Sequence, residues 1–289
     1  MALQRANPIV ARESTATMRV LAISDLHTDF KENRWFLEQL SGTAYREDVL
    51  IVAGDIADRL PIVQWTLALL RAKFRQVLYV PGNHELWVRK GQGTSVEKFF
   101  TILELCEALD VQTGPAKIEG FWIVPLFSWY EASFDVDNSA DVKALDGWAD
   151  FHLCKWPGEI GPVADFFLQM NEPTLKSYEG PVISFSHFLP RRDLLPATAN
   201  LRFKGLPKVA GCTALDAQIR RLKSQLHVFG HSHISCDRLI DGVRYIQNPL
   251  RYPFERLRRP PTGSMLGTIL LCIYPPPAYL RQSEELGNG

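Results

Sequence analysis

The sequence lacks any long hydrophobic run. No apolar stretch among its 289 residues is long enough to cross a bilayer, so we expect no membrane span. Residues 1–17 contain Arg5 and Arg12 but not the apolar segment of a secretory signal. We predict that they form a disordered tail, with a short targeting tail as the alternative.

An excess of either charge is also missing. The chain has 32 basic and 32 acidic residues, so it has no global positive field of the kind that attracts nucleic acid. We therefore expect no nucleic-acid partner, although local basic patches are still possible.

Paired cysteine motifs are absent as well. The five cysteines are scattered and include no CxxC pair, which argues against a disulfide framework and against a cysteine zinc site. A reducing compartment explains them most simply, and we expect a cytoplasmic location.

What is present is an ordinary globular composition, 46% hydrophobic and 22% charged. Short apolar runs alternate with segments of helical spacing. Continuous apolar runs are typical of strands buried on both faces of a layered sheet. The runs predict strands at 18–24, 48–53, 76–80, 120–128, 181–185, 226–229, 243–247 and 267–274.

Helical spacing predicts the elements between these strands. The expected helices are 33–40, 61–74, 95–108, 163–178 (broken near Pro173) and 213–224, with Pro61 in a first turn and Ser95 as an N-cap. This alternation favours an α/β sandwich. We expect one domain over residues 18–274, with an irregular insertion at about 130–162 and a polar tail at 275–289.

Polar clusters follow five of the strands directly. Open α/β sheets place their ligands at the carboxyl ends of the strands, so folding would gather these clusters along one edge. The clusters are Asp25-x-His27, Gly54-Asp55-Ile56-Ala57-Asp58, Gly82-Asn83-His84-Glu85, Ser186-His187 and Gly230-His231-Ser232-His233.

The side chains in these clusters are donors for metal ions. Carboxylate and amide oxygens with imidazole nitrogens, and no thiolate, suit manganese, iron or zinc. Seven donors are too many for one tetrahedral ion and suit two ions that share a carboxylate. The seven are Asp25, His27, Asp55, Asn83, His187, His231 and His233.

In this order, the five motifs resemble the motif set of the calcineurin-like metallophosphoesterase superfamily, over most of the chain. The resemblance implies a four-layer α/β/β/α sandwich of two mixed sheets flanked by helices. It also implies two metal ions that share Asp55. The first would be held by Asp25, His27, Asp55 and His233, and the second by Asp55, Asn83, His187 and His231.

The resemblance implies further roles around the metals. His84 would stand near the leaving group, Asp58 would orient His84, and Glu85 would support the site from behind. Arg59 follows Asp58, as an arginine does in the phosphoprotein phosphatases of the superfamily. It is therefore a candidate phosphate contact, with an ordinary surface residue as the alternative.

Two departures argue against that phosphoprotein branch. His187 is followed by Phe-Leu-Pro rather than by a glycine pair, and Gly82 is preceded by Val-Pro rather than Leu-Arg. We therefore expect a small phosphorylated substrate, a phosphomonoester or a phosphodiester. The resemblance implies in-line attack by a hydroxide that bridges the two metals.

Two other functions are considered. The first is a nuclease, which the neutral net charge disfavours. The second is a metal-binding scaffold without activity, but such members of the superfamily usually lose the residue that corresponds to His84, which is present here.

Several residues outside the motifs have two interpretations. Arg191 and Arg192 follow His187 and could meet an anionic substrate. Residues 251–259 hold four arginines, which could form a phosphate-binding rim, a partner surface or a solvated face. Trp122, Trp129, Trp148 and Trp156 could stack bases, although core packing is the commoner use. We expect structural roles for His152 and His227.

Overall fold

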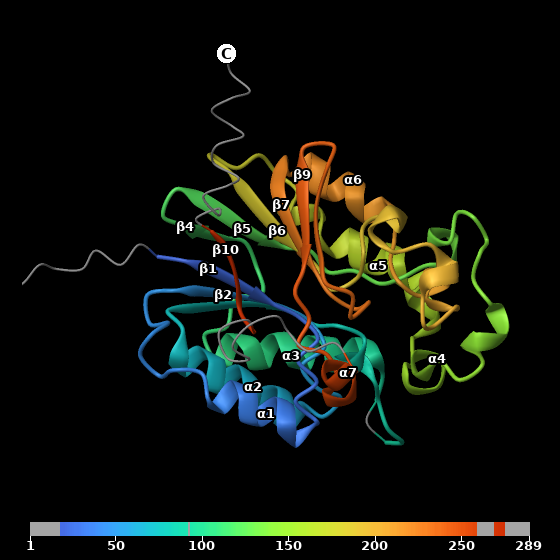
Figure 1. The fold of residues 1–289 in the computed structure, drawn as a ribbon, viewed down its shortest axis with the longest axis horizontal. Helices are drawn as coiled ribbons and strands as arrows, with labels where there is room; N and C mark the ends of the chain where they lie inside the picture. Colours follow the sequence, from blue (N-terminus) through green and yellow to red (C-terminus); the bar gives the residue numbers. More distant parts are fainter. Residues whose placement is uncertain (1–17, 92, 259–268, 275–289) are drawn as a thin grey trace, which may run out of the picture.

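Two β-sheets face each other in the computed structural model, which describes residues 18–91, 93–258 and 269–274 (Figure 1). Helices cover the outer face of each sheet. This is the four-layer α/β/β/α arrangement that the motifs imply. The tails expected at 1–17 and 275–289 lie outside the described residues.

The first sheet has the strand order β10-β1-β2-β3. β1, β2 and β3 are parallel, and β10 pairs antiparallel with β1. The strands are β1 (Val20–Ile23), β2 (Val49–Ala53), β3 (Gln76–Val80) and β10 (Leu271–Tyr274). The helices over this sheet are α1 (Lys31–Glu38), α2 (Leu60–Lys73) and α3 (Ser95–Ala108).

The second sheet has the order β4-β5-β6-β7-β9-β8, with four parallel strands between two antiparallel edge strands. Its strands are β4 (Ala116–Ile118), β5 (Phe121–Pro125), β6 (Val182–Phe185), β7 (Ser224–Phe229), β8 (Cys236–Ile240) and β9 (Val243–Gln247). The remaining helices are α4 (Ala149–Leu153), α5 (Val163–Met170), α6 (Ala214–Arg221) and α7 (Pro253–Arg258).

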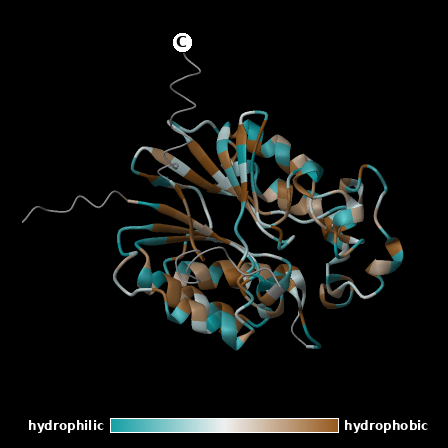
Figure 2. Ribbon diagram, in the orientation of Figure 1, coloured by the Kyte–Doolittle hydropathy of each residue, from teal (hydrophilic) through white to brown (hydrophobic). Residues whose placement is uncertain are grey.

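The apolar core lies in layers that follow this architecture. Ile51, Phe185 and Val228 pack in the layer between the two sheets. Further apolar layers join each sheet to its helices. The inner strands are buried on both faces, which explains their continuous apolar sequences and their largely brown colour in Figure 2. In the part of the chain that the structure describes, no helix could cross a membrane.

Some of the predicted elements need correction. The edge strands β4 and β8 were not predicted, because β4 has three residues and β8 is largely exposed and has two charged residues, Asp237 and Arg238, in its apolar run. α7 was also missed. The break expected near Pro173 is present: the helix ends at Met170, ahead of a short 3-10 turn that contains Pro173, but the chain does not return to an α-helix before residue 178.

The N-cap of α3 is Thr94 and not Ser95. Thr94 and Glu97 form a reciprocal capping box, in which each side chain accepts from the other residue's backbone N–H. Ser95 is buried and its hydroxyl donates to the Leu86 carbonyl at 2.7 Å. Ser95 therefore ties the start of α3 to the loop that follows β3.

We expect Ile51→Ala to lower the free energy of unfolding by about 2–5 kcal/mol, because it opens a cavity between the sheets. Ile51 is fully buried there. Urea unfolding followed by circular dichroism measures the change. Val136→Ala is the control, since Val136 is 66% exposed and should change stability by less than about 0.5 kcal/mol. Equal effects of the two substitutions would contradict this description of the core.

Candidate metal centre

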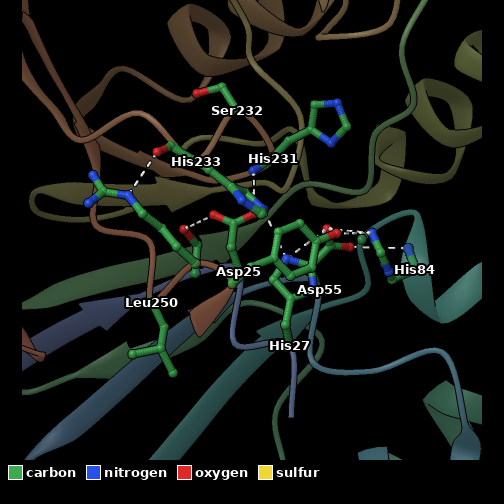
Figure 3. A network of polar contacts seen from close by, with 12 residues as sticks. Asp25, His27, Asp55, His84, His231, Ser232, His233 and Leu250 are labelled. Carbon is green, nitrogen blue, oxygen red and sulfur yellow. Dashed lines mark hydrogen bonds and ion pairs between the residues drawn. The ribbon is translucent and has the colours of Figure 1, made fainter. Parts of the chain in front are cut away.

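The strand ends bring the seven predicted metal donors together in the fold. Asp25 follows β1, Asp55 follows β2, Asn83 follows β3, and His187 and His231 follow β6 and β7. Six of the seven donors are buried, and His233 is partly exposed. Figure 3 shows Asp25, His27, Asp55 and His233 gathered at the strand ends, with His84 at one side of the group.

The backbone at this centre is unusual. Five of the seven donors have φ values in the left-handed region, from 42° to 71°: Asp25, His27, Asp55, His231 and His233. For residues other than glycine this conformation costs about 1–3 kcal/mol each and is concentrated at functional sites. Hydrogen bonds between loops hold it, including Asp25 N to Gly54 O at 3.0 Å and His27 N to Asp55 O at 2.9 Å.

The donors form two groups that share Asp55. Within each group, one donor atom per residue lies within 4.8 Å of the others. The first group contains Asp25, His27, Asp55 and His233, and the second contains Asp55, His187 and His231. The carbonyl oxygen of Asn83 lies 3.2 Å from His187 Nε2 and 3.1 Å from His231 Nδ1, so Asn83 joins the second group.

Hydrogen bonds determine which nitrogen of each ring in the second group carries the proton. His187 Nδ1 lies 2.9 Å from the Ala53 carbonyl, and His231 Nε2 lies 2.9 Å from the Val209 carbonyl. A carbonyl only accepts, so these two nitrogens must be the donors. In the neutral rings, His187 Nε2 and His231 Nδ1 therefore present lone pairs to the centre.

The oxygens of this group also present lone pairs. The Asn83 side-chain nitrogen donates to Asp150 Oδ1 at 2.9 Å, which turns the Asn83 oxygen toward the two imidazoles. Asp55 Oδ1 lies 3.4 Å from His187 Nε2. Electron-rich atoms that face one another without a proton between them repel, and a cation among them reverses the sign of the interaction. The second group therefore fits a metal ion.

The first group is arranged in a similar way. His233 Nδ1 lies 2.7 Å from Glu255 Oε2, so its Nε2 faces inward, 2.9 Å from His27 Nε2 and 3.6 Å from Asp25 Oδ1. A carboxylate behind a histidine is the usual support of a metal-binding imidazole. Asp25 also accepts from His231 N at 2.8 Å, which links the two groups.

The pKa values of His27, His231 and Asp55 reflect burial without a compensating charge, whereas Asp25 and Glu255 outweigh burial at His233 and raise its pKa. Burial lowers the pKa of His27 and of His231 well below the ordinary value, and nearby imidazoles add to the effect. Burial raises the pKa of Asp55 well above its ordinary value, and the negative charges of Glu85 and Asp25 add to this effect. A bound cation would favour the neutral imidazoles and the ionised carboxylate that ligation requires.

Glu85 supports the centre from behind, as the resemblance implied. Its carboxylate accepts from Gly82 N at 2.8 Å and Asp55 N at 3.2 Å, and also from Ile56 N. Glu85 thus ties the loop after β2 to the loop after β3. A Cβ atom at Gly82 would lie 2.2 Å from Asp55 Oδ1, so only glycine allows the two loops to approach this closely.

His84 lies beside the centre, at the start of a short 3-10 helix (His84–Leu86). Its Nε2 is 3.9 Å from Asp55 Oδ2 and 3.2 Å from the Tyr252 hydroxyl. Burial, with a contribution from nearby imidazoles, lowers the pKa of His84 to about 3, so the ring is neutral at pH 7. The Asp58 carboxylate accepts from Arg89 at 2.7 Å, and the proposed orientation of His84 by Asp58 stays a prediction.

A cavity of about 830 Å³ opens over the centre. Its polar floor contains Asp55, Asn83, His84, His231 and His233. Its wall is largely apolar, and Trp148 stacks on Phe203 there with ring centroids 5.2 Å apart and planes 10° from parallel. The other apolar wall residues are Pro196, Leu201, Leu206, Ile234 and Phe254.

The predicted substrate arginines are not among the residues that line this cavity: Arg59, Arg191 and Arg192. Arg191 pairs with Asp193 at 2.8 Å, and Arg192 donates to Pro196 O and the Thr198 hydroxyl. The arginines that do line it are Arg202, which the sequence did not indicate, and Arg251, which belongs to the 251–259 segment considered as a possible phosphate-binding rim.

Three residues at the centre were missed from the sequence: Asp150, Tyr252 and Glu255. Asp150 is buried and accepts from Asn83, from Trp87 Nε1 at 2.6 Å and from Trp148 Nε1 at 2.9 Å. It lies within the insertion, where no periodic pattern marks it. Only its position between two aromatic residues, Trp148 and Phe151, could have drawn attention to it.

The remaining ambiguous residues divide between structure and site. Trp129 is buried in the core, and Trp156 packs against it, whereas Trp148 lines the cavity. His227 is fully buried in β7 and bonds to two serine hydroxyls, and the exposed His152 bonds to a backbone carbonyl. These contacts agree with structural roles for both histidines.

Two sheets flanked by helices, with paired donor groups at the strand ends, define a metal-dependent phosphoric ester hydrolase. A model described as calcineurin-like phosphoesterase matches residues 18–235. The chain belongs to the calcineurin-like phosphoesterase family.

Two comparisons concern one relative from Mycobacterium tuberculosis. The chain is 30% identical over 272 residues to the [acyl-carrier-protein] phosphodiesterase PptH of strain ATCC 25618 / H37Rv, covering 83% of this chain and 80% of that protein. The crystal structure of phosphopantetheinyl hydrolase (PptH) from Mycobacterium tuberculosis superposes with a TM-score of 0.75 at 27% identity, covering 91% of this chain and 98% of the other.

We expect Asp150→Asn to weaken metal binding at the second group by about tenfold to a hundredfold, because the residue behind a ligand sets its orientation. Asp150 Oδ1 accepts hydrogen bonds from both Asn83 and Trp87. An asparagine has only one side-chain oxygen, and its amide nitrogen cannot accept, so it cannot replace all the bonds that the two carboxylate oxygens make. Titration with zinc, followed by calorimetry, measures the affinity. Asp137→Asn, an exposed change in the same insertion, is the control. Wild-type affinity at both sites in Asp150→Asn would contradict the role.

Proposed function

We propose that this protein is a two-metal phosphodiesterase that releases a phosphopantetheinyl group from an acyl carrier protein. The observation that carries the proposal is the cavity of about 830 Å³, which has the paired donor groups at its floor and an apolar wall above them. The similarity to PptH over most of both chains supports the choice of substrate.

The proposed first ion is held by Asp25, His27, Asp55 and His233, and the second by Asp55, Asn83, His187 and His231, as the two donor groups suggest. Oxygen and nitrogen donors without thiolate suit manganese, iron or zinc. When bound, two such ions would supply Lewis acidity and neutralise charge on the phosphoryl oxygens.

The protein's own groups would then orient the diester. His84 faces the cavity beside Asp55, where its ring can hydrogen-bond the oxygen that leaves phosphorus. The apolar wall around Trp148 and Phe203 would cover the pantetheinyl arm and exclude water from it. Arg202 is exposed at the same wall, so its charge is placed to meet an anionic substrate or the acidic surface of a carrier protein.

The metal requirement gives the first prediction for activity. Removal of metal with a chelator should abolish hydrolysis of bis(p-nitrophenyl) phosphate, and manganese should restore it, because the bound ions would supply the Lewis acidity and the charge that the reaction needs. His84→Asn should lower kcat by about a hundredfold or more with metal retained. His152→Asn, which changes an exposed histidine outside the centre, is the control. Unchanged turnover in His84→Asn would contradict the role of His84.

A second experiment addresses the substrate itself. Manganese-loaded enzyme is incubated with an acyl carrier protein that bears the phosphopantetheinyl group, and intact-protein mass spectrometry follows the carrier. We expect the carrier to lose the whole phosphopantetheinyl group, and we expect no loss with Asp55→Asn. Hydrolysis of the chromogenic diester with the carrier left intact would refute the substrate while leaving the phosphodiesterase activity in place.

A further inference from the structure

The segment that follows β9 closes one side of the metal centre. It lies beyond residue 235, where the match to the family model ends. Its backbone is hydrogen-bonded to the first donor loop: Leu250 N donates to Ser24 O at 2.8 Å, and Arg251 N donates to Asp25 O at 3.0 Å. Figure 3 shows Leu250 beside Asp25. The backbone of this segment is therefore fixed to the loop that carries the donor Asp25.

Arg251 turns the chain sharply at this point. Its φ is 71°, in the left-handed region, and the Asn33 side chain donates to its carbonyl at 2.9 Å. The Arg251 side chain donates to the His233 carbonyl at 2.9 Å. A residue other than glycine keeps this conformation only when its surroundings hold it there. The next residue, Tyr252, is consequently directed into the centre.

The Tyr252 ring is held on two sides. It stacks on His27, with centroids 4.2 Å apart and planes 29° from parallel. Phe254 stacks with it at 5.3 Å and 14°. The ring is anchored by these stacks, and its hydroxyl reaches His84 Nε2 at 3.2 Å. One side chain therefore connects a donor of the first group with the histidine beside the leaving group.

Glu255 secures the same turn. One of its oxygens, Oε2, bonds to His233 Nδ1 at 2.7 Å and accepts from Tyr252 N at 3.2 Å. The carboxylate that orients His233 therefore also holds the backbone of Tyr252. Movement of the turn would disturb His27, His84 and His233 together.

We propose that Tyr252 is a positioning residue for His84 in phosphodiester hydrolysis, a role that rests on the proposed function. Three other groups lie close to the His84 ring: His27 meets it edge-on at 4.7 Å, Trp87 lies at 3.8 Å, and Asp55 Oδ2 lies 3.9 Å from its Nε2, beyond hydrogen-bond distance. Such contacts confine the ring to a region but do not define where its Nε2 points. The hydrogen bond to Tyr252 defines that direction, toward the cavity that both residues line.

Tyr252→Phe tests this role, because it removes the hydroxyl and keeps the ring that stacks on His27. With the chromogenic diester we expect kcat to fall about tenfold, the value of one directed hydrogen bond, while KM and metal content stay at wild-type values. Tyr178→Phe is the matched control, since that hydroxyl bonds to the Thr174 carbonyl away from the centre. Unchanged kcat in Tyr252→Phe would overturn the proposal.

A double-mutant cycle separates action through His84 from a direct effect. In a His84→Asn background, Tyr252→Phe should cause no further loss, because the group it positions is already gone. A second loss of about tenfold in that background would show that Tyr252 acts independently of His84 and would overturn the positioning role. Loss of metal from Tyr252→Phe would assign the residue to the metal groups instead.

A measurement without turnover keeps this proposal distinct from the proposed function. In the zinc-loaded protein, nitrogen NMR of labelled histidines reports on the His84 ring even if the diester proves to be no substrate. Tyr252→Phe should shift the His84 Nε2 resonance and leave the exposed His152 unchanged. An unshifted His84 resonance would overturn the role of Tyr252, whatever the activity of the wild-type protein.

Discussion

The metal centre depends first on one electrostatic constraint, the convergence of buried lone pairs in the second donor group with no proton among them. His187 and His231 each use one ring nitrogen to bind a backbone carbonyl, and the other nitrogen is left to face the Asn83 oxygen. Such an arrangement is repulsive without a cation and favourable with one. This arrangement requires a left-handed backbone at five donors, which is unfavourable for residues other than glycine. It also requires glycine at position 82, where a Cβ atom would collide with Asp55.

The sequence was informative where the fold repeats a simple rule. Strands buried on both faces have to be apolar, and the polar residues at their carboxyl ends then meet at one edge. The fold class and the gathering of residues such as Asp25 and Asn83 follow from this rule. The edge strands β4 and β8 do not obey it, because they expose part or most of their side chains. The exposed β8 and the three-residue β4 were therefore missed.

The supporting residues could not be found in the same way. Asp150 lies 67 residues from Asn83, and Tyr252 lies 168 residues from His84, in segments without periodic patterning. The arginines show the opposite error. Because Arg191 is close to His187 in sequence, it was expected to contact the substrate. In the folded loop its guanidinium group pairs instead with the neighbouring carboxylate of Asp193. Sequence indicates which groups are available, whereas tertiary contacts decide which of them are already engaged.

Each donor group is oriented by a carboxylate from a segment outside the five strand-end motifs. Asp150 comes from the insertion and orients Asn83, while Glu255 comes from α7 and orients His233. Each carboxylate also holds an aromatic residue of the cavity wall, Trp148 for Asp150 and Tyr252 for Glu255. The wall of the cavity and the donors that would hold the metals are therefore linked through the same two carboxylates. A change in the insertion or in α7 that disturbs one of these carboxylates would therefore act on both a residue of the cavity wall and a donor, so the shape of the cavity and the geometry of the donors are physically coupled.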